Sequence, residues 1–286
     1  MNDTIRKVIN EKMIDDITEL ERIFEADFLY IDGPISAELN SVVVDEIGLL
    51  RKYDTHGKLC IMLTTNGGDA NSAERLVNVF RHNYDTVYFI IPDYAYSAGT
   101  ILCMSGDKIF MNYNSVLGPI DPQVQNKEGR FVPALGYLDK IDTLLEAARD
   151  GSISQAEFLI LKDFDLAELS LYEQARDLTV DLLKDWLVKY KFKDWTKHKS
   201  TGKEVSVSEK ENRAKEIAEG LGNYKRWKAH GRPLNIETLR NLKLIIDDFS
   251  DIENAEKYIL SFYSMAREFK QLSNMGGMTF TREGRI

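Results

Sequence analysis

The stretch KLCIMLTTNGGD, residues 58–69, decides the fold of this chain. Its first eight residues form a continuous apolar run, which is typical of a strand buried on both faces. Asn66, Gly67 and Gly68 then give a strong turn signal. Apolar residues at helical spacing follow, namely Ala73, Leu76, Val77 and Phe80. The stretch therefore predicts a buried strand, a glycine corner and a covering helix.

The same strand-then-helix order recurs on both sides of this stretch. A short strand is predicted at 28–31, a helix capped by Ser36 follows it, and further apolar strands are predicted at 86–91 and 108–111. Apolar strands that alternate with helices indicate a parallel sheet covered on both faces. We therefore predict an α/β fold, in which chemistry collects at the carboxyl ends of the strands.

The second half of the chain is predicted to be mostly helical. A long periodic pattern covers 165–192, Ser208 with Glu211 predicts a capping box, and Ser250 with Glu253 predicts another. The predicted organisation has three parts. They are an N-terminal helix (1–26), a core domain (27–250, with an α/β part at 27–134 and a helical part at 135–250), and a C-terminal helix and tail (251–286).

Composition excludes several function classes. The net charge is −9, from 37 basic and 46 acidic residues, so the basic footprint of a nucleic-acid-binding protein is missing. No apolar stretch approaches the roughly 18 residues of a membrane span, and no signal peptide pattern occurs. We expect no membrane anchor in this chain. Cys60 and Cys103 lie in apolar stretches and are predicted to be buried thiols, which favours the cytoplasm.

Cofactor motifs are also missing. The sequence has neither the Walker pattern nor G-x-G-x-x-G, and neither H-E-x-x-H nor paired C-x-x-C. We therefore expect no metal and no cofactor.

Two corners could carry chemistry. Gly67 and Gly68 allow close approach of a ligand, and their N–H groups could hold an oxyanion. Taken alone, however, the two glycines favour an ordinary strand-to-helix turn. Ser97 lies where an apolar strand gives way to a helix, flanked by Ala98 and Gly99. A helix N-terminus favours an attacking hydroxyl. The alternative is that Ser97 only caps the helix.

Four segments in order carry a family resemblance. They are TTNGGDANSAERL, AYSAGTILCMSGDKIFM, SVLGPIDPQ and HGRPLNIETLRNLKLII. Together they resemble the serine dehydrogenase proteinase family, within the wider group of the Clp protease proteolytic subunit and signal peptide peptidase A. The resemblance covers about 29–248. It implies a Clp/crotonase-type fold, a spiral of ββα units with a helical C-terminal half, usually assembled into homo-oligomers.

The resemblance also implies a serine-peptidase mechanism on peptide or protein substrates. Ser97 matches the serine nucleophile. Gly67 and Gly68 match the glycines beside the oxyanion hole, whose N–H donors would be Gly68 and Ala98. The Clp subunit has a histidine where this chain reads VLGPIDPQ, and no histidine occurs there.

The general base therefore has several candidates. Histidine side chains in general titrate near neutrality. The segment of His230 could return to the site, where Asp121 could orient this histidine. Lys162 or Lys140 could serve instead, as a lysine does in signal peptide peptidase A, if burial lowered the lysine pKa toward roughly 7–8. A third possibility is that no working base exists.

Three functions follow from these residues. The first is a cytoplasmic serine peptidase that acts through an acyl-enzyme on Ser97. The second is a non-catalytic oligomeric scaffold on the same fold, favoured by the absent histidine near residue 120. The third is a crotonase-like acyl-CoA enzyme, which would need a carboxylate acid or base rather than Ser97.

Overall fold

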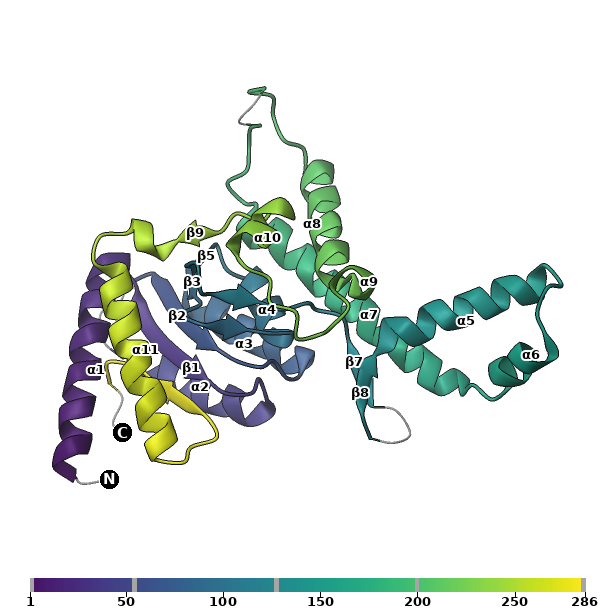
Figure 1. Cartoon of the computed structure of the whole chain (residues 1–286). Helices are drawn as coiled ribbons and strands as arrows, with labels where there is room; N and C mark the ends of the chain where they lie inside the picture. The colour runs from purple at the N-terminus through teal and green to yellow at the C-terminus, as the bar shows by residue number, and fades with distance from the viewer. Residues whose placement is uncertain (1–2, 53–55, 126–128, 199–200, 284–286) are drawn as a thin grey trace.

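The computed structural model describes residues 3–52, 56–125, 129–198 and 201–283, and its centre is a six-stranded sheet (Figure 1). The strand order is β10-β1-β2-β3-β5-β9. The strands are β1 (Asp27–Asp32), β2 (Lys58–Thr64), β3 (Thr86–Ile90), β5 (Lys108–Met111), β9 (Asp247–Asp248) and β10 (Met278–Phe280). All neighbours pair in parallel except β10, which is antiparallel to β1 at one edge. The predicted parallel sheet is confirmed.

Two hydrophobic cores cover the two faces of this sheet. One face packs α2 (Ala37–Leu50), α3 (Ala70–Asn83), α4 (Ala98–Met104), the C-terminal part of α7 (Leu166–Trp186) and α8 (Val207–Gly222). The other face packs α1 (Asp3–Phe24) and α11 (Ala255–Leu272), which lie side by side in Figure 1. Both terminal helices are therefore part of the core. Cys60 and Cys103 are buried free thiols, one in each core, as predicted.

An arm projects from this body. It consists of the hairpin β7 (Gln123–Gln125) and β8 (Phe131–Pro133), then α5 (Ala134–Arg149), α6 (Gln155–Lys162) and the start of α7 (Figure 1). A π-helix, η1 (Leu187–Lys191), ends α7. The remaining short elements are β4 (Tyr94–Ala95), β6 (Val116–Leu117), α9 (Tyr224–Trp227), α10 (Ile236–Asn241) and the 3-10 helix η2 (Phe249–Asp251). The helical second half is confirmed.

Two predicted helix starts are wrong. The sequence SVSEKE contains two overlapping S-x-x-E patterns, and the capping box of α8 uses Ser206 with Glu209, two residues before the predicted pair. Ser250 is not the N-cap of α11. It lies inside η2, where the Asp248 side chain caps the helix and accepts the Ser250 N–H. The helix then begins after Asn254.

Candidate active site

Ser97 joins β4 to α4 in a conformation that is rare for a residue with a side chain. Its φ is 53° and its ψ is −118°. Such an angle costs of the order of 1–3 kcal/mol and is typical of serines on a sharp strand-to-helix turn. The Ser97 side chain makes no capping hydrogen bond to α4. The interpretation of Ser97 as a simple helix cap is therefore wrong, and its half-buried hydroxyl is available for another role.

Gly67 lies directly against Ser97. Its φ is 105°, and a Cβ added there would be 2.8 Å from Ser97 Cβ and 2.9 Å from the Tyr96 carbonyl oxygen. The turn is held by Thr65, whose Oγ1 accepts the Gly67 N–H at 2.9 Å. The absence of a side chain at Gly67 is thus what lets the β2 corner touch the serine turn.

The amides of Gly68 and Ala98 are free in the same place. Gly68 has a φ of 148° and lies so close to Ile35 that a Cβ would be 2.1 Å from the Ile35 carbonyl oxygen. Within the described part of the chain, neither the Gly68 N–H nor the Ala98 N–H donates to a protein acceptor. Free N–H groups beside a nucleophile are what stabilising a tetrahedral oxyanion requires.

A small sheet brings a distant segment to the serine turn. β4 pairs in parallel with β6, and Leu117 of β6 exchanges two backbone hydrogen bonds with Leu234, at 3.0 and 2.9 Å. Gly118 lies against Tyr96, because a Cβ at Gly118 would be 2.4 Å from the Tyr96 ring. Gly118 therefore lies next to the turn that carries Ser97, and the chain before Leu234 runs alongside the chain after Leu117.

His230 and Asp121 meet at this place. His230 Nδ1 is 3.0 Å from Asp121 Oδ1, and Asp121 is only 1% exposed. The second carboxylate oxygen, Oδ2, accepts from Gln123 Nε2 at 2.7 Å. The described residues contain no hydrogen bond between Ser97 and His230 and none from His230 Nε2. Sequence analysis missed Gln123, although an i, i+2 spacing from Asp121 in an extended segment was its available signal.

The structure does not bring the candidate lysines to Ser97. Lys140 on α5 and Lys162 at the end of α6 are both exposed, and Figure 1 shows these helices on the projecting arm, well away from α4. The burial that a lysine base needs occurs instead at Lys191, whose pKa burial lowers to about 8. Lys191 lies near Cys103, at the opposite end of α4 from Ser97.

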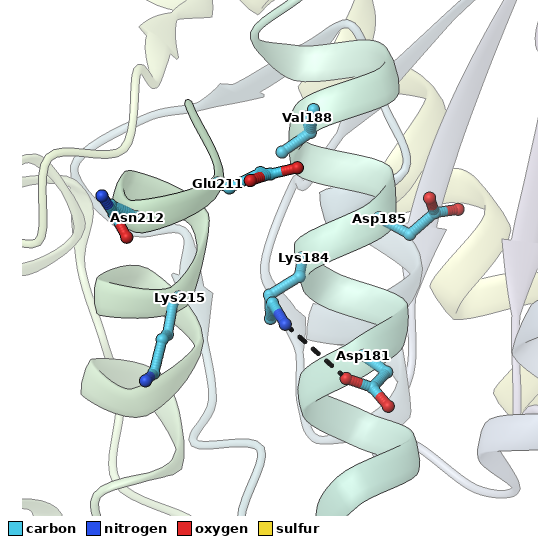
Figure 2. Close-up of a pocket in the computed structure, with 7 residues that line it drawn as sticks. All are labelled: Asp181, Lys184, Asp185, Val188, Glu211, Asn212 and Lys215. Atoms are coloured by element: carbon cyan, nitrogen blue, oxygen red, sulfur yellow. Dashed lines mark ion pairs between the residues drawn. The ribbon is translucent and has the colours of Figure 1, made fainter. Parts of the chain in front are cut away.

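Two surface hollows among the described residues are not lined by Ser97. A groove of about 480 Å³ lies between α7 and α8. Figure 2 shows Lys184 paired with Asp181 on α7 and Lys215 on the facing helix α8. A smaller pocket of about 320 Å³ lies at the carboxyl ends of β1 and β2 and includes Tyr94, whose ring stacks on Tyr96 at 5.6 Å. Within the described residues, no group of three or more His, Cys, Asp or Glu side chains could hold a metal ion.

A family model described as ClpP-like SDH-type serine proteinase matches residues 3–208. The chain belongs to this family. The ClpP-like α/β fold that the sequence resemblance implied is thereby confirmed. The residues that the family model matches include Ser97, Gly67, Gly68 and Asp121, whereas His230 lies beyond them.

Two curated relatives come from Methanocaldococcus jannaschii. The uncharacterized protein MJ1495 is 30% identical over 143 residues, covering 50% of this chain and 44% of its own length. The uncharacterized protein MJ0137 is 27% identical over 187 residues, covering 65% of this chain and 52% of its own length. The chain thus spans about half the length of the curated relatives it matches.

Two solved structures are also similar to this chain. One is an alanine mutant of the 1510-N membrane-bound stomatin-specific protease, at 21% identity and a TM-score of 0.33, covering 47% of this chain and 69% of that one. The other is a mutant of the same protease with a substrate peptide, at 22% identity and a TM-score of 0.33, covering 43% and 58%. Among the described residues, none of the helices has the length and apolar character to cross a bilayer.

Proposed function

We propose that this chain is an active serine peptidase with Ser97 as nucleophile, His230 as general base and Asp121 as the residue that orients it. The observation that supports the proposal most is the His230–Asp121 hydrogen bond, which joins two segments that pair through Leu117 and Leu234, and Leu117 in turn pairs with Ala95 just before Ser97. A carboxylate at Nδ1 places the imidazole proton there and leaves Nε2 as the basic nitrogen. His230 is 26% exposed, so Nε2 can meet a substrate.

The reaction proceeds by acyl transfer. Ser97 Oγ attacks the peptide carbonyl carbon while His230 Nε2 takes the hydroxyl proton, and the carbonyl oxygen becomes an oxyanion held by the N–H groups of Gly68 and Ala98. The C–N bond then breaks, and His230 returns the proton to the leaving amine. Water, deprotonated by His230, attacks the acyl-enzyme and releases the acid. Asp121 stays ionised and stabilises the imidazolium.

The distance between Ser97 and His230 must close in this mechanism. The side chains are not hydrogen bonded in the free chain. Catalytic hydrogen bonds are often long before substrate binds and tighten in the complex. His230 follows α9 in a short exposed segment that Leu234 anchors to β6, and in the proposed mechanism this segment moves to bring Nε2 to the serine.

The lysine alternatives need a different arrangement. Lys140 and Lys162 are exposed on the arm, so neither meets the burial condition for a neutral amine within a single chain. The cytoplasmic location and homo-oligomeric assembly expected from the sequence remain proposals. The buried thiols support the first, and the exposed apolar side chains of α6, namely Phe158, Leu159 and Ile160, support the second.

Covalent labelling tests the nucleophile. A fluorophosphonate should label the wild-type protein and not the Ser97→Ala variant, whereas Ser41→Ala, an exposed serine on α2, should label like the wild type. Cleavage of a mixed peptide library, read by mass spectrometry, then tests peptidase activity. If no variant labels and no peptide is cleaved, the scaffold function is correct instead. Equal labelling of the wild type and Ser97→Ala would reject Ser97.

A further inference from the structure

The segment that carries His230 is unusually basic for this protein. Residues 224–236, YKRWKAHGRPLNI, contain four Lys or Arg and no Asp or Glu, although the chain as a whole has a net charge of −9. The four cations are all exposed, and they are Lys225, Arg226, Lys228 and Arg232. They surround His230 on both sides in the sequence. A local excess of positive charge therefore lies beside the proposed base.

Most of this charge is not neutralised within the chain. Lys225 forms an ion pair with Asp139. Arg226, Lys228 and Arg232 have no ion-pair partner among the residues that the structure describes. Asp121, the acid that contacts His230, is buried and also accepts a hydrogen bond from Gln123.

The local structure holds these cations in place. The Arg226 guanidinium lies over the Trp227 ring at 4.5 Å, and the Trp227 indole donates to the Gly220 carbonyl at 2.9 Å. Lys228 ends α9 in a left-handed conformation with φ of 64°. The Arg232 N–H donates to the Ala229 carbonyl at 3.1 Å, which folds the segment into a turn around His230. The charges are therefore presented on a shaped segment.

We propose that residues 225–232, the basic segment, bind acidic side chains of the peptide substrate and make this peptidase selective for acidic sequences. The selectivity rests on the proposed function, because it assigns the segment to the mouth of the Ser97 site. Complementary charge speeds encounter with an acidic peptide and disfavours a basic one. Carboxylates also accept the forked donors of Arg226 and Arg232 well.

Binding to the Ser97→Ala protein tests the proposal without turnover. Three fluorescein-labelled peptides share one sequence and differ only in carrying Glu, Gln or Lys at the same three positions, and their Kd values come from fluorescence anisotropy. Each exposed charge pair contributes a factor of roughly 1.5 to 5 at low salt. We therefore expect the Glu peptide to bind about tenfold more tightly than the Gln peptide, and the Lys peptide to bind most weakly.

Salt and charge reversal make the test specific. The Glu preference should fall severalfold as salt shortens the Debye length to about 8 Å. The double variant Lys228→Glu/Arg232→Glu, on the Ser97→Ala background, should abolish or invert the preference. Lys257→Glu reverses the charge of an exposed cation on α11 and should leave the preference for the Glu peptide unchanged. Thermal unfolding of each variant confirms that it folds.

Two results would overturn the proposal: equal Kd values for the Glu and Gln peptides, or a preference that survives the double reversal. Its failure is distinct from failure of the proposed function. If Ser97 labels with fluorophosphonate but the peptides bind alike, only the acidic selectivity is wrong. If Ser97 does not label but the Glu preference depends on Lys228 and Arg232, the segment binds acidic peptides and only the peptidase chemistry is wrong.

Discussion

His230 Nδ1 lies 3.0 Å from Asp121 Oδ1, although the two residues are 109 positions apart in the sequence. The backbone pairing of Leu117 with Leu234 makes this contact possible, because it brings the chain after β6 next to the chain before α10. A carboxylate at one ring nitrogen of a histidine fixes the tautomer and the orientation of the ring, and leaves the other nitrogen as the acceptor. The pair is thus arranged as an oriented base.

Removing the base should nearly abolish turnover. We expect His230→Gln to lower kcat/KM by about 10²–10⁴-fold, the usual contribution of a general base. Asp121→Asn should also lower it strongly, because an amide can donate to Nδ1 and so favour the wrong tautomer. The measurement is cleavage of a peptide identified from the library, with fluorophosphonate labelling rates as a second readout.

His198 provides a matched control for this prediction. It is a partly exposed histidine paired with Glu209 at 3.0 Å, on a different part of the chain. His198→Gln should keep wild-type kcat/KM. If His230→Gln also stays within about threefold of the wild type, well below the 10²-fold that a general base contributes, another group takes the serine proton.

Gln123 should position Asp121 without touching the substrate. Gln123→Leu removes the donor to Asp121 Oδ2, so the Asp121 carboxylate turns away from His230 part of the time. We expect kcat/KM to fall about tenfold. This corresponds to about 1.4 kcal/mol, close to the contribution of one charged hydrogen bond. In Gln123→Glu the protonated acid can still donate this bond, whereas the ionised form repels Asp121.

The pH profile separates positioning from a general structural defect. The ratio of kcat/KM for Gln123→Glu to kcat/KM for the wild type should approach one at low pH. This ratio should decline as pH rises, because the proton that the new glutamate shares with Asp121 is lost. Gln123→Leu should stay low throughout. Parallel loss in both variants at every pH would mean that Gln123 only supports the fold of the β7–β8 hairpin.

The sheet and its covering helices could be predicted because local pattern and burial agree there. The apolar run of β2 is buried along nearly its whole length, and α2 begins after Ser36, whose side chain accepts the Leu39 N–H as expected. The start of α8 could not be chosen from sequence, because two capping boxes overlap and only packing of Ala214, Ile217 and Leu221 fixes the register.

The site was harder to predict because it depends on contacts between distant segments. Gly67 follows β2 and Ser97 follows β3 and β4, and β2 and β3 are neighbours in the sheet. The contact between the two turns therefore follows from the order of the strands. The meeting of His230 with Asp121 depends instead on a two-residue pairing that carries no sequence signal. An apolar sequence around Lys162 also suggested burial, yet α6 has no buried residue, because its apolar side chains point into solvent from the arm.

A methyl group at Gly67 should damage the site, whereas the same change at Gly48 should not. Gly67→Ala introduces a Cβ within 2.8 Å of Ser97 Cβ at a φ of 105°, which must displace the serine turn. A misplacement of about 1 Å can cost roughly 10²-fold in rate, so we expect at least that loss of kcat/KM. Labelling kinetics and unfolding in urea measure activity and stability separately.

Gly48 lies in α2 with no atom within 4 Å of an added Cβ. Gly48→Ala should therefore keep full activity and raise the free energy of unfolding by about 0.5–1 kcal/mol, because alanine loses less backbone entropy in a helix. If Gly67→Ala behaved like Gly48→Ala, the tight contact between the β2 corner and Ser97 would not matter for catalysis.

Lys191 should make the stability of the protein depend on pH. Burial lowers the Lys191 pKa to about 8 in the folded chain, against 10.5 for the ordinary side chain. Between these two values the unfolded chain holds a proton that the folded chain lacks, so the free energy of unfolding rises with pH across this window, by at most about 3 kcal/mol. Below pH 8 both states are protonated, and the full cost of burying the charge is present.

Replacing the amine should remove this dependence. Lys191→Met should be more stable than the wild type at pH 7, and the advantage should shrink steadily between about pH 8 and 10.5. Urea unfolding of both proteins at several pH values measures the difference in their free energies of unfolding. The titration of all other groups affects both proteins alike and cancels from this difference. Lys189→Met changes an exposed lysine of the same π-helix and should show no such trend. A constant difference between Lys191→Met and the wild type would show that the Lys191 amine stays charged in the folded chain.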